Sequence, residues 1–189
     1  MRNILIIVDG DNDDARLKEE IVNEIRNYLK NDYNTDFIYL DKVNLKGCLG
    51  CFKCWTKTPG ECIIKDDNEM KNRLFIEADY VIFVSKINYG MYSASFKVAL
   101  DRIIPNISPF FKIINGEMHH RKRYNKDFKI LTIGYSSNLL IDEKKTFEEI
   151  VKRNMINLHS KKNGVLVLES FNDLGKKIFN ELESFCEVN

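Results

Sequence analysis

The segment RNILIIVDG, residues 2–10, places five consecutive aliphatic residues, Ile4 to Val8, directly before an Asp-Gly turn pair. A run that is apolar at every position predicts a β-strand covered on both faces. Four more runs of strand length follow, at residues 37–40, 80–84, 130–133 and 165–168. Amphipathic stretches with apolar residues at helical spacing separate these runs. The alternation predicts an α/β fold with a five-stranded parallel sheet and helices on both of its faces.

The composition is typical of one globular domain. The chain has 189 residues, with 29 Lys plus Arg against 28 Asp plus Glu, and only three prolines and nine glycines. We therefore expect a single domain over residues 1–189. The balanced charge gives no reason to expect a nucleic-acid partner. The longest apolar run is far shorter than the roughly 20 residues that cross a bilayer, and the first residues lack the pattern of a secretory signal. We expect no membrane contact and a cytoplasmic protein.

Residues 44–65 form a long loop after the second predicted strand. The loop carries four cysteines in the spacing C-x2-C-x2-C-x7-C: Cys48, Cys51, Cys54 and Cys62. Four thiolates this close together can converge on one metal centre, as iron-sulfur clusters and structural zinc require. Three cysteines at successive three-residue steps favour a [4Fe-4S] cluster over zinc, which more often uses two separated pairs. Thiols without a metal are the remaining alternative.

Residues 85–102, SKINYGMYSASFKVALDR, lead from the third predicted strand into a helix. This segment, together with the cysteine loop, resembles the flavodoxin-like NAD(P)H-dependent FMN reductases, and in particular the iron-sulfur flavoproteins among them. The family pattern here is roughly P-x-Y-x-G-x-x-S-A-x-x-K-x-x-x-D-R. The chain keeps six of its residues: Gly90, Ser93, Ala94, Lys97, Asp101 and Arg102. It departs at two positions, with Lys86 in place of proline and Asn88 in place of tyrosine.

The resemblance implies a flavodoxin-like three-layer sandwich with strand order 2-1-3-4-5. It also implies FMN at the mouth between the first and third strands, with NAD(P)H as donor. The isoalloxazine edge would face two short segments, namely Ile87, Asn88, Tyr89, Gly90 and Met91, and then Gly134, Tyr135 and Ser136. Backbone N–H groups in such loops can hydrogen-bond a flavin, and tyrosines can stack on it. Members of the family usually form homodimers or homotetramers, so we expect the same, with a small molecule or a protein as redox partner.

The loop after the first strand departs from the family. Its members usually have G-S-x-R here, followed by small hydroxyl residues that cradle the FMN phosphate, whereas this chain reads DGDNDDAR over residues 9–16. Four carboxylates so close together are expected to repel a phosphate and to compete for the helix dipole that would bind it. Gly10, Asn12 and Arg16 are then the candidate phosphate ligands.

Three other interpretations of this acidic loop stay open. Asp9, Asp11, Asp13 and Glu20 fall at positions 1, 3, 5 and 12 of a calcium-binding loop, although Asp14 stands where that loop needs glycine. The D-x-D at the end of the strand also resembles the start of haloacid-dehalogenase-type phosphatases, whose carboxylates hold Mg²⁺ and attack phosphate. In the simplest interpretation the acidic residues cap and solvate the first helix.

A second long loop is predicted at residues 105–127, and its basic side chains outnumber its acidic ones. Between Lys112 and Lys129 the sequence has six basic residues against two acidic ones. Such a loop can close over an active site and attract the phosphates of a nicotinamide cofactor or of FMN. A solvated surface loop and a dimer contact are the alternatives.

From these residues we predict an FMN-dependent oxidoreductase or electron-transfer flavoprotein, with a [4Fe-4S] cluster on the four cysteines. The alternative is a flavodoxin-fold protein that has lost FMN binding and serves as a metal-binding or partner-binding module. A Mg²⁺-dependent phosphatase that acts through Asp9 and Asp11 is the third hypothesis. The sequence assigns no catalytic residue and no substrate.

Overall fold

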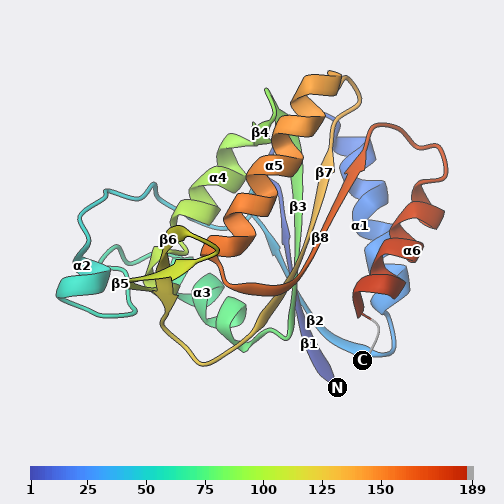
Figure 1. The fold of residues 1–189 in the computed structure, drawn as a ribbon. Helices are drawn as coiled ribbons and strands as arrows, with labels where there is room; N and C mark the ends of the chain where they lie inside the picture. The colour runs from blue at the N-terminus through green and yellow to red at the C-terminus, as the bar shows by residue number, and fades with distance from the viewer. Residues whose placement is uncertain (187–189) are drawn as a thin grey trace.

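The computed structural model describes residues 1–186, so the predicted domain, residues 1–189, includes three residues outside the described part. Its centre is a parallel sheet in the strand order β2-β1-β3-β7-β8 (Figure 1). The strands are β1 (Arg2–Val8), β2 (Tyr33–Tyr39), β3 (Tyr80–Asn88), β7 (Phe128–Tyr135) and β8 (Ser160–Leu168). β1, β3, β7 and β8 contain the predicted apolar runs, whereas β2 begins four residues before its run and ends one residue before the end of that run. The strand order confirms the predicted 2-1-3-4-5 arrangement.

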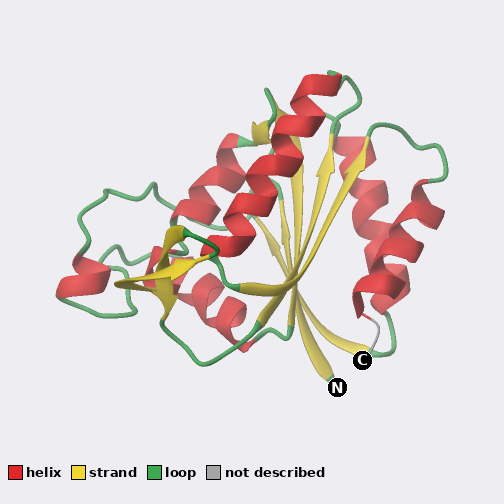
Figure 2. Ribbon diagram, in the orientation of Figure 1, coloured by secondary structure: helices red, strands yellow, loops and turns green. Residues whose placement is uncertain are grey.

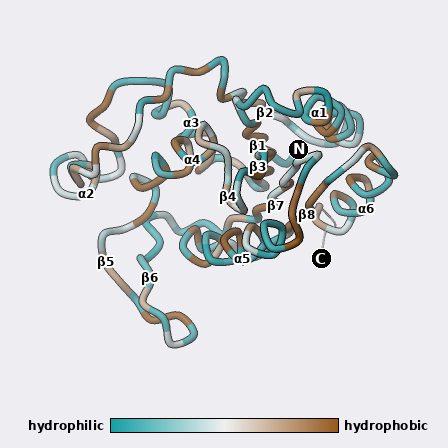
Figure 3. Tube along the Cα trace, turned by 90° about the horizontal axis from the view of Figure 1, so that it is seen from above, coloured by the Kyte–Doolittle hydropathy of each residue, from teal (hydrophilic) through white to brown (hydrophobic). Residues whose placement is uncertain are grey.

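Helices cover both faces of the sheet (Figure 2). They are α1 (Ala15–Leu29), α3 (Asn68–Glu77), α4 (Ala94–Asp101), α5 (Ile141–Asn157) and α6 (Leu174–Cys186), with a short α2 (Lys53–Thr56) in the cysteine loop. Figure 3 shows α1 and α6 on one side of the sheet and α3, α4 and α5 on the other. No helix among residues 1–186 is both long enough and apolar enough to cross a membrane.

Side chains along β1 alternate between two hydrophobic cores. Ile4 and Ile6 pack with residues of α1 and α6, whereas Leu5 and Ile7 pack with residues of α3, α4 and α5. Successive side chains of a strand point to opposite faces of a sheet. A run that is apolar throughout is therefore what a sheet covered on both sides requires.

β3 continues past the residues predicted for it and turns back as the short strand β4 (Met91–Tyr92). Asn88 pairs with Met91 across a two-residue turn, in which Tyr89 and Gly90 have φ of 53° and 73°. Positive φ at both positions is typical of a type I′ hairpin turn. A Cβ atom at Gly90 would lie 3.0 Å from Cβ of Thr146, so this turn rests against α5.

The prediction of a loop at residues 105–127 is wrong. The segment contains a 3-10 turn, η1 (Ile104–Asn106), and an antiparallel hairpin formed by β5 (Ile107–Ile114) and β6 (Glu117–Lys122). Asn115 and Gly116 make the turn, both with positive φ. Asn-Gly is the strongest short-range signal for such a turn, so the sequence did contain the signal for this hairpin. In Figure 3 the hairpin projects away from the sheet.

Candidate functional site

An open cleft of about 470 Å³ lies at the carboxyl ends of β3 and β7. Open parallel sheets bind ligands at this edge. The cleft is lined by the acidic loop after β1, the end of β3, the loop after β7 and the beginning of α5. Four residues that were predicted to face a flavin line it: Ile87, Asn88, Tyr89 and Ser136.

Tyr89 is the only one of the candidate stacking tyrosines that is free to contact a ligand. Its side chain is 91% exposed at the tip of the β3–β4 turn. Tyr92 is buried in the core, where its ring stacks on Phe96 with the ring centroids 5.3 Å apart. Gly90 is buried in the turn, and Met91 lines a neighbouring hollow instead of the cleft.

Gly134 and Tyr135 lie behind the cleft and not in its wall. A Cβ atom at Gly134 would lie 2.5 Å from the Phe147 ring and 2.8 Å from Ile87, so this position must be glycine to let α5 approach. Tyr135 is fully buried, and within residues 1–186 its hydroxyl has no hydrogen-bond partner. Burial raises the pKa of Tyr135, and the negative charge of Asp9 adds to this rise. These two residues therefore support the cleft from below.

Asp9 is a structural carboxylate. It is fully buried at the end of β1 and accepts hydrogen bonds from the backbone N–H of Lys86 at 2.7 Å and of Asp11 at 2.9 Å. The hydroxyls of Ser93 and Ser95, at the beginning of α4, donate to it at 2.7 and 2.5 Å. The Ser85 hydroxyl is a fifth donor, at 3.4 Å. A carboxylate enclosed by five donors cannot attack a phosphate ester, so the geometry disfavours the phosphatase hypothesis.

The other three carboxylates of the acidic loop each have a partner outside it. Asp13 forms an ion pair with Lys86 at 2.9 Å. Asp11 accepts a hydrogen bond from the Asn88 side chain at 3.3 Å. Asp14 accepts from both the hydroxyl and the backbone N–H of Ser137, at 2.5 and 3.2 Å. Asp14 directly precedes α1, yet its side chain makes no capping hydrogen bond, so the helix-cap interpretation is wrong for its side chain.

Cations offset the negative charge that the sequence predicted to be unopposed. Lys86 reaches the loop from β3, and Nζ of Lys18 contacts the carbonyl oxygens of Asp11 at 2.5 Å and Asp9 at 3.3 Å. Burial alone would lower the pKa of Lys86, but its hydrogen bond with Asp13 and the nearby acidic charges raise it above the ordinary value. The loop is therefore not a set of free carboxylates facing a ligand. Its contacts with Lys86, Asn88 and Ser137 also engage the carboxylate oxygens that a calcium ion would need as ligands.

The three predicted phosphate ligands do not line the cleft. Gly10 packs against the backbone of Leu40 and Asp41, and its N–H donates to Ser95 at 3.2 Å. Asn12 is exposed, and the Arg16 guanidinium lies 5.1 Å from the centre of the Phe171 ring. None of the three is among the residues around the 470 Å³ opening.

Lys86 and Ser137 are among the cleft residues that sequence reasoning missed. Lys86 lies near the end of β3, where it pairs with Tyr135 of β7, and its neighbour Ser85 lies one step beyond the pair Val8–Val84. Because parallel neighbours end at the same edge of a sheet, a lysine at the end of β3 can reach acids at the end of β1. The position of Lys86 near the end of β3 was therefore the signal in the sequence that it could contact the acidic loop.

The four cysteines line one narrow cavity of about 30 Å³. Cys48 and Cys51 are exposed, whereas Cys54 and Cys62 are half-buried. Burial raises the pKa of Cys54, and the nearby Cys62 raises it further. The chain thus places the four thiols around a common opening, but among the described residues they are not gathered into a ready metal site.

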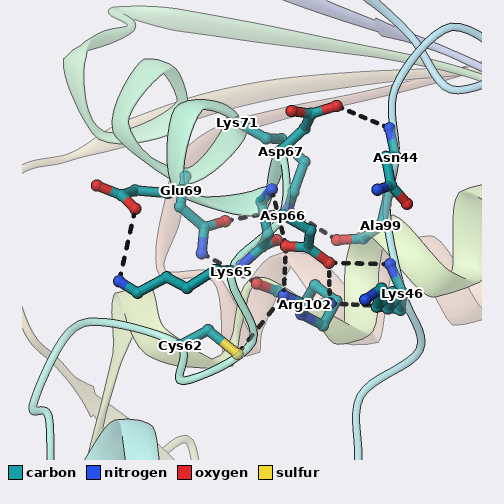
Figure 4. A network of polar contacts seen from close by, with 12 residues as sticks. Asn44, Lys46, Cys62, Lys65, Asp66, Asp67, Glu69, Lys71, Ala99 and Arg102 are labelled. Atoms are coloured by element: carbon teal, nitrogen blue, oxygen red, sulfur yellow. Dashed lines mark hydrogen bonds and ion pairs between the residues drawn. The ribbon is translucent and has the colours of Figure 1, made fainter.

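Arg102, at the end of α4, holds the second half of the cysteine loop (Figure 4). Its guanidinium donates to both carboxylate oxygens of Asp66, at 2.8 and 2.9 Å, and the two side chains are 1% and 0% exposed. It also donates to the sulfur of Cys62 at 3.5 Å and to the carbonyl of Lys46. Burial alone would raise the pKa of Asp66, but the hydrogen bonds from Arg102 and from the backbone keep it below the ordinary value. Lys97, also on α4, pairs with Asp101 and not with this network.

Two aspartates, Asp66 and Asp67, close the neck of the cysteine loop, where residues 44–46 meet residues 66–67. Asp66 accepts from the backbone N–H of Lys46 at 2.9 Å, and Asp67 accepts from that of Asn44 at 2.7 Å (Figure 4). The backbone N–H of Asp67 donates in return to the carbonyl of Asn44 at 3.2 Å. The two ends of the loop are therefore fixed to each other while the cysteines lie beyond them.

The basic hairpin lies beside the cysteine loop and not over the cleft. The indole of Trp55 donates to the carbonyls of Ile104 and Ile107 at 3.2 and 3.1 Å, and its ring lies 4.9 Å from that of His120. Glu117 pairs with Arg153 of α5 at 2.6 Å. No hairpin residue lines the cleft, so the predicted closure over that site is not observed.

A family model described as NADPH-dependent FMN reductase matches residues 2–124, which include β1, the acidic loop, the cysteine loop and the β3–β4 turn. An iron-sulfur flavoprotein of Archaeoglobus fulgidus is 32% identical over 93 residues, which cover 49% of this chain and 37% of that protein. An iron-sulfur flavoprotein of Methanocaldococcus jannaschii is 38% identical over 71 residues, 38% of this chain and 36% of that protein. The chain therefore matches about a third of the length of these curated relatives.

Solved structures share the whole fold at low sequence identity. An NAD(P)H:quinone oxidoreductase from Methanothermobacter marburgensis superposes with a TM-score of 0.68 at 10% identity and covers 100% of both chains. An FMN-dependent NADH-azoreductase from Bacillus anthracis, solved with FMN, has a TM-score of 0.62 at 14% identity and covers 97% of both chains. Because the family model matches residues 2–124, well over half of the chain, the chain belongs to the NADPH-dependent FMN reductase family.

Proposed function

We propose that this protein is an FMN-dependent oxidoreductase or electron-transfer flavoprotein that takes electrons from NAD(P)H. The observation that carries the proposal is the open cleft at the ends of β3 and β7, of whose eleven lining residues six lie in the part of the chain that matches the family. A ligand site at this edge is what an open parallel sheet provides.

The side chains of the cleft are suited to a flavin. Tyr89 offers an exposed ring for an isoalloxazine, and the backbone and side chains of Asn88 and Ser136 offer donors and acceptors for its polar edge. Lys86 places a cation at the end of the cleft nearest the acidic loop. FMN, when bound, supplies hydride and electron transfer, while the protein binds and orients it.

We extend the proposal to a [4Fe-4S] cluster on Cys48, Cys51, Cys54 and Cys62. Three observations support it: the four thiols share one cavity, the Cys62 sulfur accepts a hydrogen bond from Arg102, and two relatives are named iron-sulfur flavoproteins. Hydrogen bonds to cysteine sulfurs are one of the ways in which proteins tune such clusters. Zinc and metal-free thiols are the other outcomes of the test below.

The proposed assembly is a cytoplasmic homodimer or homotetramer that passes electrons to a small molecule or a protein. The β5–β6 hairpin supports self-association, because it exposes four large apolar side chains: Phe110, Phe111, Ile113 and Met118. Exposed apolar patches on a surface often mark interfaces. Sedimentation velocity over a range of micromolar concentrations checks the proposed self-association, and a monomer at every concentration would contradict it.

The test is an absorption spectrum of protein purified without oxygen, repeated after FMN has been added and the excess removed by gel filtration. We expect retained flavin with a band at about 450 nm that NADH or NADPH bleaches. We also expect a broad cluster shoulder at about 400 nm, with iron and acid-labile sulfide, both lost in Cys51→Ser.

Two results would count against the proposal separately. Protein that retains no FMN would favour a flavodoxin-fold module that has lost its cofactor. Protein that retains FMN but contains zinc, or no metal, would leave the oxidoreductase proposal in place and remove the cluster.

A further inference from the structure

We propose that Lys86 binds the phosphate of the cleft's ligand, and that it gives up Asp13 in exchange for this phosphate. The inference deepens the proposed function and rests on it. Nζ of Lys86 lies 2.9 Å from the carboxylate of Asp13, and both side chains line the cleft. The lysine side chain is 11% exposed, so its charge has little access to water and requires a negative partner.

Asp13 is the carboxylate that can leave. Its side chain is 82% exposed, and Lys86 is the partner that holds it. Asp9, by contrast, is enclosed by five donors, and Asp14 is bound through both oxygens by Ser137. Because the Asp13 carboxylate is exposed, water can solvate it when it leaves, so a phosphate with two negative charges can compete for the lysine.

Three cations lie near the acidic loop in the chain or contact it in space: Arg16, Lys18 and Lys86. Lys18 is committed to two backbone carbonyls of the loop, and Arg16 lies over Phe171. Lys86 is therefore the cation of this group that lines the cleft and can change partner.

Contacts between the unusual positions of the chain support the same assignment. Lys86 and Asn88 stand where the resembled family has proline and tyrosine, and they contact Asp13 and Asp11 of the equally unusual acidic loop. A lysine from β3 thus stands beside the loop that otherwise supplies phosphate donors. The acidic loop and β3 form one unit in which the phosphate contact has moved to the neighbouring strand.

The test compares FMN with riboflavin, which differs only in lacking the phosphate, by fluorescence titration of flavin-free protein. In Lys86→Met we expect the affinity for FMN to fall by about ten- to a hundredfold while riboflavin binding stays unchanged, since one charge-assisted contact is lost. In Asp13→Asn, which removes the competitor from an exposed site, we expect FMN to bind several-fold more tightly and riboflavin as before.

Lys144→Met provides the matched control, because Lys144 forms a surface pair with Glu169 at 2.8 Å outside the cleft lining, and both affinities should be unaffected. The inference is overturned if Lys86→Met weakens both flavins equally, or if neither variant changes the ratio of the two affinities. If the unaltered protein binds neither flavin, the proposed function fails first and this inference falls with it. If the unaltered protein binds both flavins and the variants leave the ratio of the two affinities unchanged, the proposed function stands and the inference about Lys86 fails.

Discussion

The loops after β1 and β2 both carry the side chains of a candidate site, but their contacts differ. In the acidic loop, residues 9–14, every carboxylate is bound to a group of the same chain. In the cysteine loop, residues 44–65, the polar contacts concentrate at the neck, and the tip exposes Leu49 and Phe52 at 73% and 52%. The first loop is complete without a ligand. The second has its ends fixed and its ligating groups left available.

Charged side chains also have different roles in the two loops. Acidic side chains of residues 9–14 serve as acceptors that join β1 to β3 and to α4. At the neck of the cysteine loop one buried ion pair, Asp66 with Arg102, does the joining and also reaches the Cys62 sulfur. A large loss is therefore expected where a buried charge is left without its partner.

The largest effect is expected at this neck. Arg102→Met leaves the Asp66 carboxylate buried without its cation, so we expect unfolding free energy to fall by about 3–5 kcal/mol in urea titrations. Limited proteolysis should then cleave within residues 44–65. Adding Asp66→Asn to this variant should recover much of the loss, and a double variant as unstable as the single one would show that the pair is not what stabilises the neck.

A smaller loss is expected in the acidic loop. Asp9→Asn replaces a buried acceptor by an amide that points an N–H₂ group at existing donors, which should cost about 2 kcal/mol by the same urea assay. Asp13→Asn, on the exposed side of the loop, is the comparison and should cost no more than about 1 kcal/mol. Equal losses in the two variants would contradict the assignment of Asp9 as the structural member.

Lys71 of α3 is expected to make the stability of the protein depend on pH. It is buried, with Nζ bound to Asn72 and to the carbonyl of Ala99, and burial, together with the charge of Arg102, lowers its pKa to about 7. In the unfolded chain its pKa is near 10.5. Between these values the unfolded state binds more protons, so stability should rise with pH, by at most about 1.4 kcal/mol per unit.

Lys71→Met should abolish that rise. Comparing unfolding at pH 7 and pH 9 in both proteins isolates the contribution, because the other titrating groups are shared. A slope that is the same with and without the lysine would mean that Lys71 stays charged in the folded protein.

The smallest effect is expected at the tip of the cysteine loop. Cys48→Ser in metal-free protein should change stability by less than about 0.5 kcal/mol, because the side chain is exposed. A large loss in metal-free protein would indicate that the tip has its own packing.

The sheet could be predicted because its information is local. Runs such as Ile4 to Val8 are apolar on both faces, and their alternation with helices leaves few possible architectures. The position of Ile87, Asn88, Tyr89 and Ser136 at the cleft could be predicted for the same reason, since they lie at or just after the ends of strands that meet at one edge.

The rest depended on contacts between residues far apart in the chain. The pairs Asp13–Lys86 and Asp66–Arg102 join residues 73 and 36 positions apart. The four acids of residues 9–14 are therefore evident in the sequence, whereas the cation that contacts them, Lys86, is not. Gly134 and Tyr135 were misplaced because an apolar strand end and a ligand wall have the same composition. The hairpin was missed although Asn115-Gly116 indicated its turn, because basic residues were taken as the mark of a loop.

Amide hydrogen exchange tests most directly whether one loop is complete and the other awaits a ligand. Exchange of residues 9–14 and 44–65 would be followed in metal-free protein and again after anaerobic reconstitution with iron and sulfide. We predict that the acidic loop is protected in both samples, and that the cysteine loop exchanges quickly at first and becomes protected on reconstitution. A cysteine loop as protected as the acidic loop before any metal is added, and unchanged afterwards, would contradict this account.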